Sequence, residues 1–148
     1  MSIENYKKFL SSGYFDENGI EKNELFLKYP KEFSEKFSNI SYSQIRGIYE
    51  RVNVISLKLK SKQYAFKNAY NDLSILFSKI NDKYNKGVIK NDLFLDFFFL
   101  NLNTIKNEKD LYCFEKHLLC ICNFYPKNNK QEQNKNYKNN GGYKKWID

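Results

Sequence analysis

Residues 40–62, "ISYSQIRGIYERVNVISLKLKSK", carry the clearest helix signal in the chain. Ser41 and Gln44 match the S-x-x-Q capping box, in which each side chain bonds a free backbone N–H at the start of a helix. The apolar residues that follow recur every three or four positions, which is the spacing of one buried helix face. They are Ile45, Ile48, Tyr49, Val52, Ile55 and Leu59. The stretch therefore predicts a long amphipathic helix from Ser41 to about Lys62.

The rest of the chain keeps this helical spacing and lacks the frequent turn residues that separate the strands of a sheet. Pro30 and Pro126 are the only prolines, and neither Asn-Gly pair joins two alternating apolar runs. We therefore predict an all-α fold, a single small bundle of about five to six helices. The further predicted helices are Ile3 to Leu10, Lys22 to Phe37 with a kink or break at Pro30, Gln63 to Tyr84 ended by Gly87, a segment to Ile105 capped by Asn91 or Asp92, and Glu108 to Tyr125 capped by Asn107 and stopped by Pro126.

Composition predicts one helical domain over residues 1–126. Hydrophobic residues make up 41% of the 148-residue chain, which is enough for a sizeable core. The net charge is +8 and the pI is near 9.2, which favours an acidic partner such as nucleic acid or an anionic membrane. An AT-rich coding bias also enriches Lys, Asn, Ile, Tyr and Phe, so the charge alone leaves both explanations open.

The most apolar segment, Leu93 to Leu102, predicts a buried helix rather than a membrane span. It is shorter than the roughly 20 residues that cross a bilayer, and Asp96 interrupts it. The first ten residues, "MSIENYKKFL", lack the apolar run of a signal peptide. The three cysteines are an odd number clustered near the last predicted helix, unlike a secreted disulfide framework. We expect a soluble, cytoplasmic protein with no membrane partner.

After Pro126 the composition changes to a basic tail, residues 127–148. The tail holds six lysines against Glu132 and Asp148, which makes four of the eight net positive charges. So polar a segment buries too little apolar surface to offset the entropy of ordering, and we predict that it is disordered. Its aromatic residues are spaced among lysines and could stack on bases, or the tail could simply be solvated. They are Tyr137, Tyr143 and Trp146.

Cys113, His117 and Cys120 lie at i, i+4 and i+7 of the last predicted helix. This spacing puts them on one face, within reach of a common metal ion, but structural zinc sites use four ligands and His117 is the only histidine. The simpler interpretation is an apolar face with small buried thiols, and we expect neither a metal nor a cofactor. The sequence has no phosphate loop, H-E-x-x-H or G-x-S-x-G motif, so we expect no catalytic residues.

Both arginines of the chain lie in the predicted 41–62 helix, and they fall on opposite sides of its apolar stripe. With about 100° per residue, Arg51, Lys58 and Lys62 gather on one flank, whereas Arg46 and Lys60 lie on the other. No acidic residue occurs from Arg51 to Asn71, and Lys67 extends the run. Such a basic ridge suits sequence-independent contact with phosphates. The candidate nucleic-acid-binding residues are Arg51, Lys58, Lys60, Lys62, Lys67 and Arg46.

Arg46 has a second interpretation, in which it is structural. It follows the helix start closely, so its guanidinium could bond the last carbonyls of the preceding helix, at Phe37 to Asn39. Arg51 lies a turn and a half further along, where phosphate is the better partner.

Residues 40–52, "ISYSQIRGIYERV", resemble the small helical subunit of type III-A CRISPR effector complexes, the Csm complexes. That family opens a long helix with an S/T-x-x-Q-[IL]-R-x-[FIL]-Y pattern, and "GYFDENG" and "ELFLKYPKEFSEKFS" upstream are similar to its lead-in. The resemblance covers about residues 14–125 and is sharpest over 40–55. Two features depart from it: Gly47 replaces a residue that is often basic, and the tail has no counterpart. The matching residues are Ser41, Gln44, Ile45, Arg46, Ile48 and Tyr49.

The resemblance implies a non-catalytic, all-helical subunit of an RNA-guided antiviral complex. Like subunits would associate with one another as a minor filament beside the other subunits of the complex. Their basic residues would face the backbone of the CRISPR RNA and its target RNA. Two rival hypotheses remain: a stand-alone helical protein–protein adaptor whose basicity reflects coding bias, and a small metal-dependent regulator that uses the cysteine–histidine face.

Overall fold

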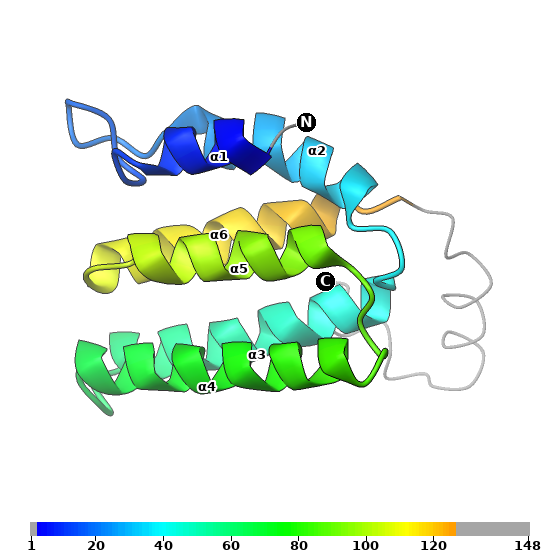
Figure 1. Cartoon of the computed structure of the whole chain (residues 1–148). Helices are drawn as coiled ribbons and strands as arrows, with labels where there is room; N and C mark the ends of the chain where they lie inside the picture. Colours follow the sequence, from blue (N-terminus) through cyan, green and yellow to red (C-terminus); the bar gives the residue numbers. More distant parts are fainter. Residues whose placement is uncertain (1–2, 127–148) are drawn as a thin grey trace, which may run out of the picture.

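The structure, a computed structural model, describes residues 3–126 and shows six α-helices in three layers of two (Figure 1). The helices α5 and α6 form the middle layer, between the α1–α2 and α3–α4 layers. Between the layers, α6 contacts α2 and α3, and α5 contacts α1 and α4, while α3 and α4 contact each other within their layer. The helices are α1 (Ile3–Leu10), α2 (Lys28–Lys36), α3 (Tyr42–Lys60), α4 (Phe66–Asn85), α5 (Asp92–Thr104) and α6 (Glu108–Phe124), with a short 3-10 helix, η1 (Asn23–Leu25). The all-α prediction is confirmed, and the predicted disordered tail lies outside the described residues.

Side-chain caps start the helices where the sequence predicts them. Gln44 N donates to Ser41 Oγ at 3.1 Å and Ser41 N donates to Gln44 Oε1 at 2.9 Å, which completes the capping box of α3. Asn91 accepts from Phe94 N and Asn107 accepts from Asp110 N, both at 2.9 Å. These bonds satisfy backbone donors that have no partner within the helix.

Two predicted helices begin later than expected. The segment Lys22 to Phe37 is divided into η1 and α2, and the break precedes Pro30 instead of falling on it. Proline has no N–H and its ring displaces the carbonyl four residues earlier, so Pro30 is tolerated only in the first turn of α2. The fourth helix starts at Phe66, because Lys62 takes a left-handed backbone conformation with φ of 61° that ends the preceding helix.

The middle layer supplies the aromatic centre of the core. Phe94, Phe97 and Phe98 of α5 are fully buried, as is Phe114 of α6. The predicted buried helix at Leu93 to Leu102 is thereby confirmed. Tyr6 of α1 contacts this centre, with its ring centroid 5.9 Å from that of Phe97.

A chain of buried hydrogen bonds crosses the core from α1 to α6. Tyr14 donates to Asn101 Oδ1 at 2.6 Å, and Asn101 Nδ2 donates to the Tyr6 hydroxyl at 2.9 Å. The Tyr6 hydroxyl lies 2.8 Å from His117 Nε2, and His117 Nδ1 lies 2.6 Å from the carbonyl oxygen of Leu25. A carbonyl only accepts, so Nδ1 carries the proton and Nε2 accepts from Tyr6. The network fixes the N-terminal segment against the middle layer.

Candidate nucleic-acid interface

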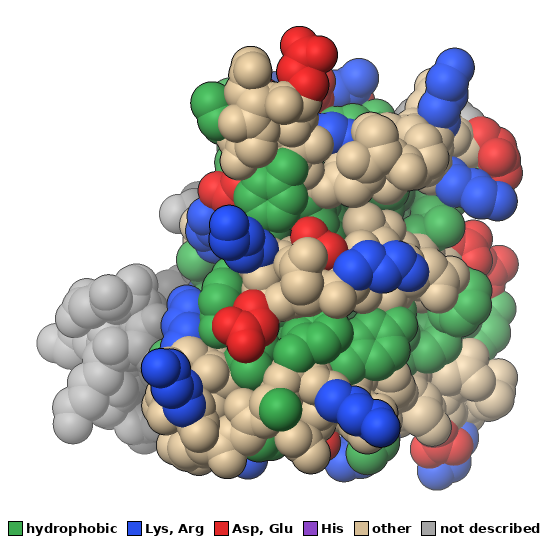
Figure 2. Space-filling view, turned by 90° about the vertical axis from the view of Figure 1, so that its left-hand side faces the viewer, with side chains coloured by type: hydrophobic (Ala, Val, Ile, Leu, Met, Phe, Trp, Pro, Cys, Tyr) green, Lys and Arg blue, Asp and Glu red, His purple; other side chains and the backbone are tan. Residues whose placement is uncertain are grey.

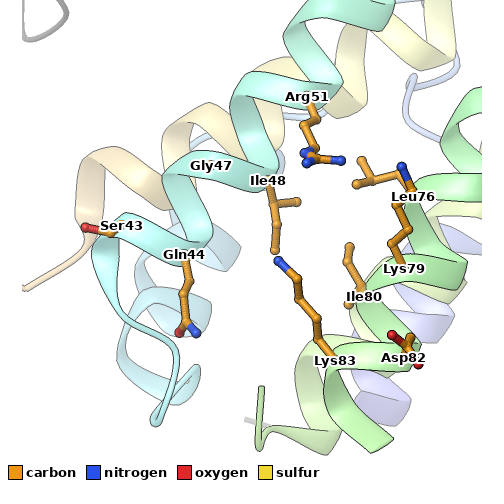
Figure 3. A pocket seen from close by; sticks show the side chains of 10 residues that line it. All are labelled: Ser43, Gln44, Gly47, Ile48, Arg51, Leu76, Lys79, Ile80, Asp82 and Lys83. Atoms are coloured by element: carbon orange, nitrogen blue, oxygen red, sulfur yellow. The ribbon is translucent and has the colours of Figure 1, made fainter. Parts of the chain in front are cut away.

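A groove between α3 and α4 lies on the Arg51 flank of α3. Its volume is about 400 Å³, and Arg51 reaches into it from α3 while Lys79 and Lys83 reach into it from α4 (Figure 3). Ile48, Leu76 and Ile80 form its buried apolar floor. The complete lining is Ser43, Gln44, Gly47, Ile48, Arg51, Leu76, Lys79, Ile80, Asp82 and Lys83.

The groove continues along α3 into a second hollow of about 450 Å³, which Arg51, Lys58 and Lys79 line together with Glu50 and Asp72. The Lys58 ammonium lies 6.0 Å from the centroid of the Tyr64 ring. The structure therefore brings Arg51 and Lys58 together on one flank of α3, as the spacing of about 100° per residue predicts.

The basic side chains of this flank are left without carboxylate partners. Arg51, Lys58, Lys62 and Lys67 are exposed, and within residues 3–126 none of them forms an ion pair. Lys62 lies in the turn after α3, with a left-handed backbone, and Lys67 lies in the first turn of α4, so the helical spacing that placed Lys62 on the Arg51 flank does not extend to it. Unpaired exposed cations of this kind are available to an external anion.

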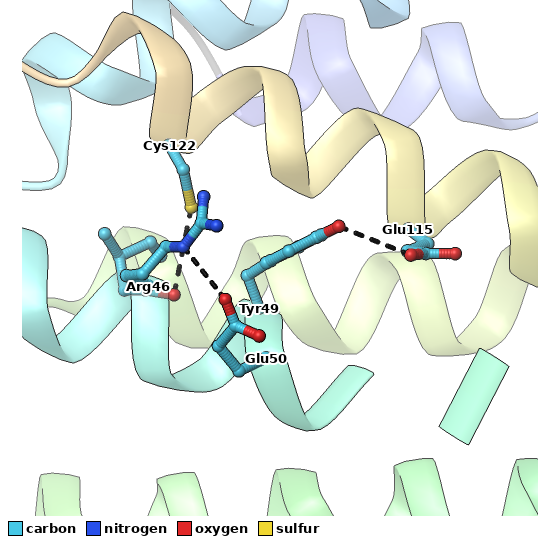
Figure 4. A network of polar contacts seen from close by, with 6 residues as sticks. Arg46, Tyr49, Glu50, Glu115 and Cys122 are labelled. Carbon is cyan, nitrogen blue, oxygen red and sulfur yellow. Dashed lines mark hydrogen bonds and ion pairs between the residues drawn. The ribbon is translucent and has the colours of Figure 1, made fainter. Parts of the chain in front are cut away.

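The opposite flank of α3 faces α6, and carboxylates neutralise it (Figure 4). Arg46 Nε lies 3.0 Å from Glu50 Oε1, and the guanidinium carbon lies 5.1 Å from the centroid of the Tyr49 ring. Lys60 Nζ lies 3.8 Å from Glu115 Oε1. Arg46 and Lys60 are thus separated from Arg51 and already have partners within the protein.

Glu115 of α6 also accepts from the Tyr49 hydroxyl at 3.4 Å. Burial, followed by the nearby Glu115 carboxylate, raises the pKa of Tyr49 to about 12. Tyr49 therefore stays a neutral donor at physiological pH. The Lys60 ammonium lies 4.9 Å from the Tyr112 ring centroid, so Lys60 is held by α6 from two sides.

The carbonyls expected to bind Arg46 have other donors. Asn91 Nδ2 donates to the carbonyl of Ser38 at 2.7 Å and to that of Lys36 at 3.3 Å. The Tyr125 hydroxyl donates to the carbonyls of Phe37 and Ile40 at 3.2 and 3.0 Å. The end of α2 is thus tied to α5 and α6, and Arg46 contacts Glu50 and Tyr49.

Lys79 and Lys83 are absent from the sequence-based candidates, although the pattern of α4 contains a signal for them. Each follows a buried residue of the α4 stripe by three positions, Leu76 and Ile80 respectively. This places both lysines on the same edge of the stripe. The sequence does not show which neighbouring helix that edge faces, and the structure identifies it as α3.

Of the cysteine–histidine face of α6, Cys113 and His117 lie in the core and Cys120 is partly exposed. Both ring nitrogens of His117 are engaged, and burial lowers its pKa to about 4. Cys113 is fully buried, and burial raises the pKa of its thiol. Within residues 3–126 no group of three or more His, Cys, Asp or Glu side chains is arranged to hold a metal ion.

Comparisons with protein-family models, with curated proteins and with solved structures give no match for this chain. None of the helices in the described part of the chain combines the length and apolarity that a membrane span requires.

Proposed function

We propose that this protein is a non-catalytic RNA-binding subunit of an RNA-guided complex, of the kind represented by the small subunit of type III-A CRISPR (Csm) effectors. Its basic flank contacts the backbone of the CRISPR RNA and its target RNA, and base pairing between those two strands supplies the sequence specificity. The chain also contacts like subunits and the other subunits of the complex.

One observation carries the proposal: α3 has basic side chains on both flanks, but carboxylates of residues 3–126 form ion pairs with only one of the two flanks. Glu50 and Glu115 pair with Arg46 and Lys60. Arg51 and the lysines that continue its flank have no ion pair within residues 3–126. At the end of the bundle that carries the α3–α4 turn, Lys and Arg side chains lie around a band of hydrophobic side chains, with Asp and Glu side chains among them (Figure 2).

The chemistry of the remaining side chains supports a binding role. His117 is the only histidine in the chain, and it lies in the core with both ring nitrogens engaged. Burial raises the pKa of Cys113, which keeps this thiol protonated and a poor nucleophile.

Co-purification tests the proposal directly. The tagged chain, isolated from its own host, is expected to bring down a ribonucleoprotein with discrete short RNAs and several further protein subunits. A chain that purifies alone, or with proteins but without RNA, would contradict the RNA-guided assignment.

A binding measurement tests the flank itself. Replacing Arg51, Lys58, Lys62 and Lys67 by Ala should weaken affinity for RNA of any sequence. Fewer counterions are released on binding when a phosphate contact is lost, so the slope of log affinity against log salt should flatten by about 0.7 to 0.9 per lost contact. Helical content should stay the same, since all four side chains are exposed. Unchanged affinity and slope would exclude this flank as the RNA contact.

A stand-alone protein–protein adaptor is the second candidate, and a specific feature favours it. Val54, Leu57 and Ile75 on α3 and α4 are about half exposed, at 49%, 53% and 53%. Apolar side chains of this kind can contribute to a protein interface. The same co-purification separates the two functions, because an adaptor is recovered with protein partners and no RNA.

A further inference from the structure

We propose that the groove between α3 and α4 is a clamp for one backbone phosphate of an RNA strand, gripped by Arg51 from one helix and by Lys79 and Lys83 from the other. This inference rests on the proposed function and names the place where the backbone is bound. Two of its three cations lie outside the ridge that the sequence predicts.

The first argument is geometric. The three cations extend from two different helices toward the same space (Figure 3). The guanidinium is planar and can donate two parallel hydrogen bonds to a phosphate, whereas the lysine ammonium groups act as point charges. The aliphatic floor formed by Ile48, Leu76 and Ile80 offers the sugar an apolar surface.

The second argument is the charge balance of the lining. Asp82 is the only acidic residue among those that line this groove. Its Oδ2 lies 2.9 Å from Lys86 Nζ, so a further lysine compensates it. The groove therefore keeps an excess of positive charge that the described part of the chain does not neutralise, and an anion is the complementary ligand.

The third argument concerns the kind of anion. The Arg51 flank continues past the groove to Lys58, so a ligand with charges at regular intervals gains more than a single ion. A nucleic-acid backbone has that repeat. An acidic peptide carries carboxylates at less regular spacing, whereas Glu50 and Asp72 in the adjoining hollow repel either polyanion. The charge pattern thus favours a phosphate-bearing strand.

Gly47 offers a test at the mouth of the groove. A Cβ built at this position meets no atom within 4 Å, and its backbone is helical with no positive φ. Replacement therefore adds a Cβ without a clash, and in a helix most residues are more favourable than glycine. Gly47→Glu, Gly47→Gln and Gly47→Lys vary the charge at the mouth while all natural cations remain.

The experiment measures binding of the full chain to a short single-stranded RNA at several salt concentrations. Gly47→Lys should bind more tightly than Gly47→Gln, and Gly47→Glu more weakly. Lys79→Ala combined with Lys83→Ala should reduce affinity by about tenfold, the size expected for losing charge-assisted contacts at an exposed site. The matched control is Lys28→Ala with Lys31→Ala on α2, on the other side of the bundle, which removes the same net charge. Circular dichroism of each variant checks that the helices are retained.

The clamp is overturned if the Lys79/Lys83 variant and the control pair lose affinity equally and the three Gly47 variants bind alike. If RNA binding then still depends on Arg51, Lys58, Lys62 and Lys67, the proposed function stands without the clamp. If the unmodified chain binds no RNA, both fail. Competition identifies the occupant: the RNA should resist inorganic phosphate, AMP and a polyglutamate peptide at equal charge. Displacement by AMP would assign the groove to a free nucleotide, and displacement by the peptide would assign it to an acidic protein.

Discussion

Acidification tests the buried network through His117, the residue that connects α6 to Tyr6 and to the carbonyl of Leu25. The imidazole is fully buried and neutral, with Nδ1 donating and Nε2 accepting. A second proton on Nε2 would remove the acceptor for the Tyr6 hydroxyl and place a charge among aromatic rings. The ring centroids of Tyr6 and Phe97 lie 6.0 and 5.6 Å from that of His117. Protonation should therefore destabilise the fold.

The magnitude follows from the pKa of His117, which burial lowers from 6.5 to about 4. The unfolded chain binds the proton more readily, so stability is complete above about pH 6.5 and decreases as the pH falls toward 4. Each unit of pKa difference corresponds to about 1.4 kcal/mol, which gives a total loss of about 3 kcal/mol from this residue. A single domain is commonly stable by only 5 to roughly 15 kcal/mol, so the loss is measurable.

Urea denaturation between pH 7.5 and 4.0 provides the assay, with His117→Gln as the comparison. Gln can donate to the Leu25 carbonyl and accept from Tyr6, and it does not titrate. The difference in unfolding free energy between the two proteins should change by about 3 kcal/mol over this range, in the direction that penalises the wild type at low pH. Carboxylates titrate in both proteins and cancel in the difference. Parallel pH profiles would show that His117 is not held neutral by its surroundings.

Three further predictions concern individual contacts and the tail. Arg46→Lys should cost about 0.5 to 1 kcal/mol of folding stability, because Lys keeps the ion pair with the half-exposed Glu50 but loses the planar contact to Tyr49. Arg51→Lys should change stability by less than about 0.5 kcal/mol and weaken RNA binding. Denaturant midpoints and RNA titrations of both variants check this, and the reverse pattern would refute it. Asn91→Ala should cost about 2 kcal/mol or more, since the side chain both caps α5 and donates to two carbonyls at the end of α2, and thermal unfolding measures the loss. Deleting residues 127–148 removes six lysines and should flatten the salt dependence of RNA binding, which titrations at several salt concentrations would show.

Local signals explain why most helix boundaries were predictable. The caps at Ser41, Asn91 and Asn107 act within four residues of the chain, and Gly87 ends α4 with φ of 75°. The late start of α4 has a different origin, because the left-handed conformation of Lys62 is unusual for a residue with a side chain. A turn that depends on a left-handed lysine cannot be recognised from the amino-acid composition of the segment.

The candidate site was predictable only as far as one helix determines it. Helical geometry separates Arg51 and Lys58 from Arg46 and Lys60, and the structure keeps that separation. Which side is neutralised depends on Glu115, which lies 55 positions after Lys60 in the sequence and reaches it only through the packing of α6 on α3. The partners of Lys79 and Lys83 across the groove are set by tertiary packing in the same way.

Coding bias accounts for the number of lysines but not for their arrangement around α3. A bias acts on codons without regard to which side of a helix a residue occupies, so it predicts that carboxylates accompany both flanks to a similar degree. Instead Glu50 and Glu115 form ion pairs with Arg46 and Lys60. The cations of the opposite flank form no ion pair in the described structure, although Glu50 and Asp72 line the hollow that Arg51 and Lys58 share. Concentrated like charge costs some stability through repulsion, and an anionic partner would offset that cost. The asymmetry of the two flanks, more than the net charge, is therefore the reason to look for RNA on the α4 side of α3.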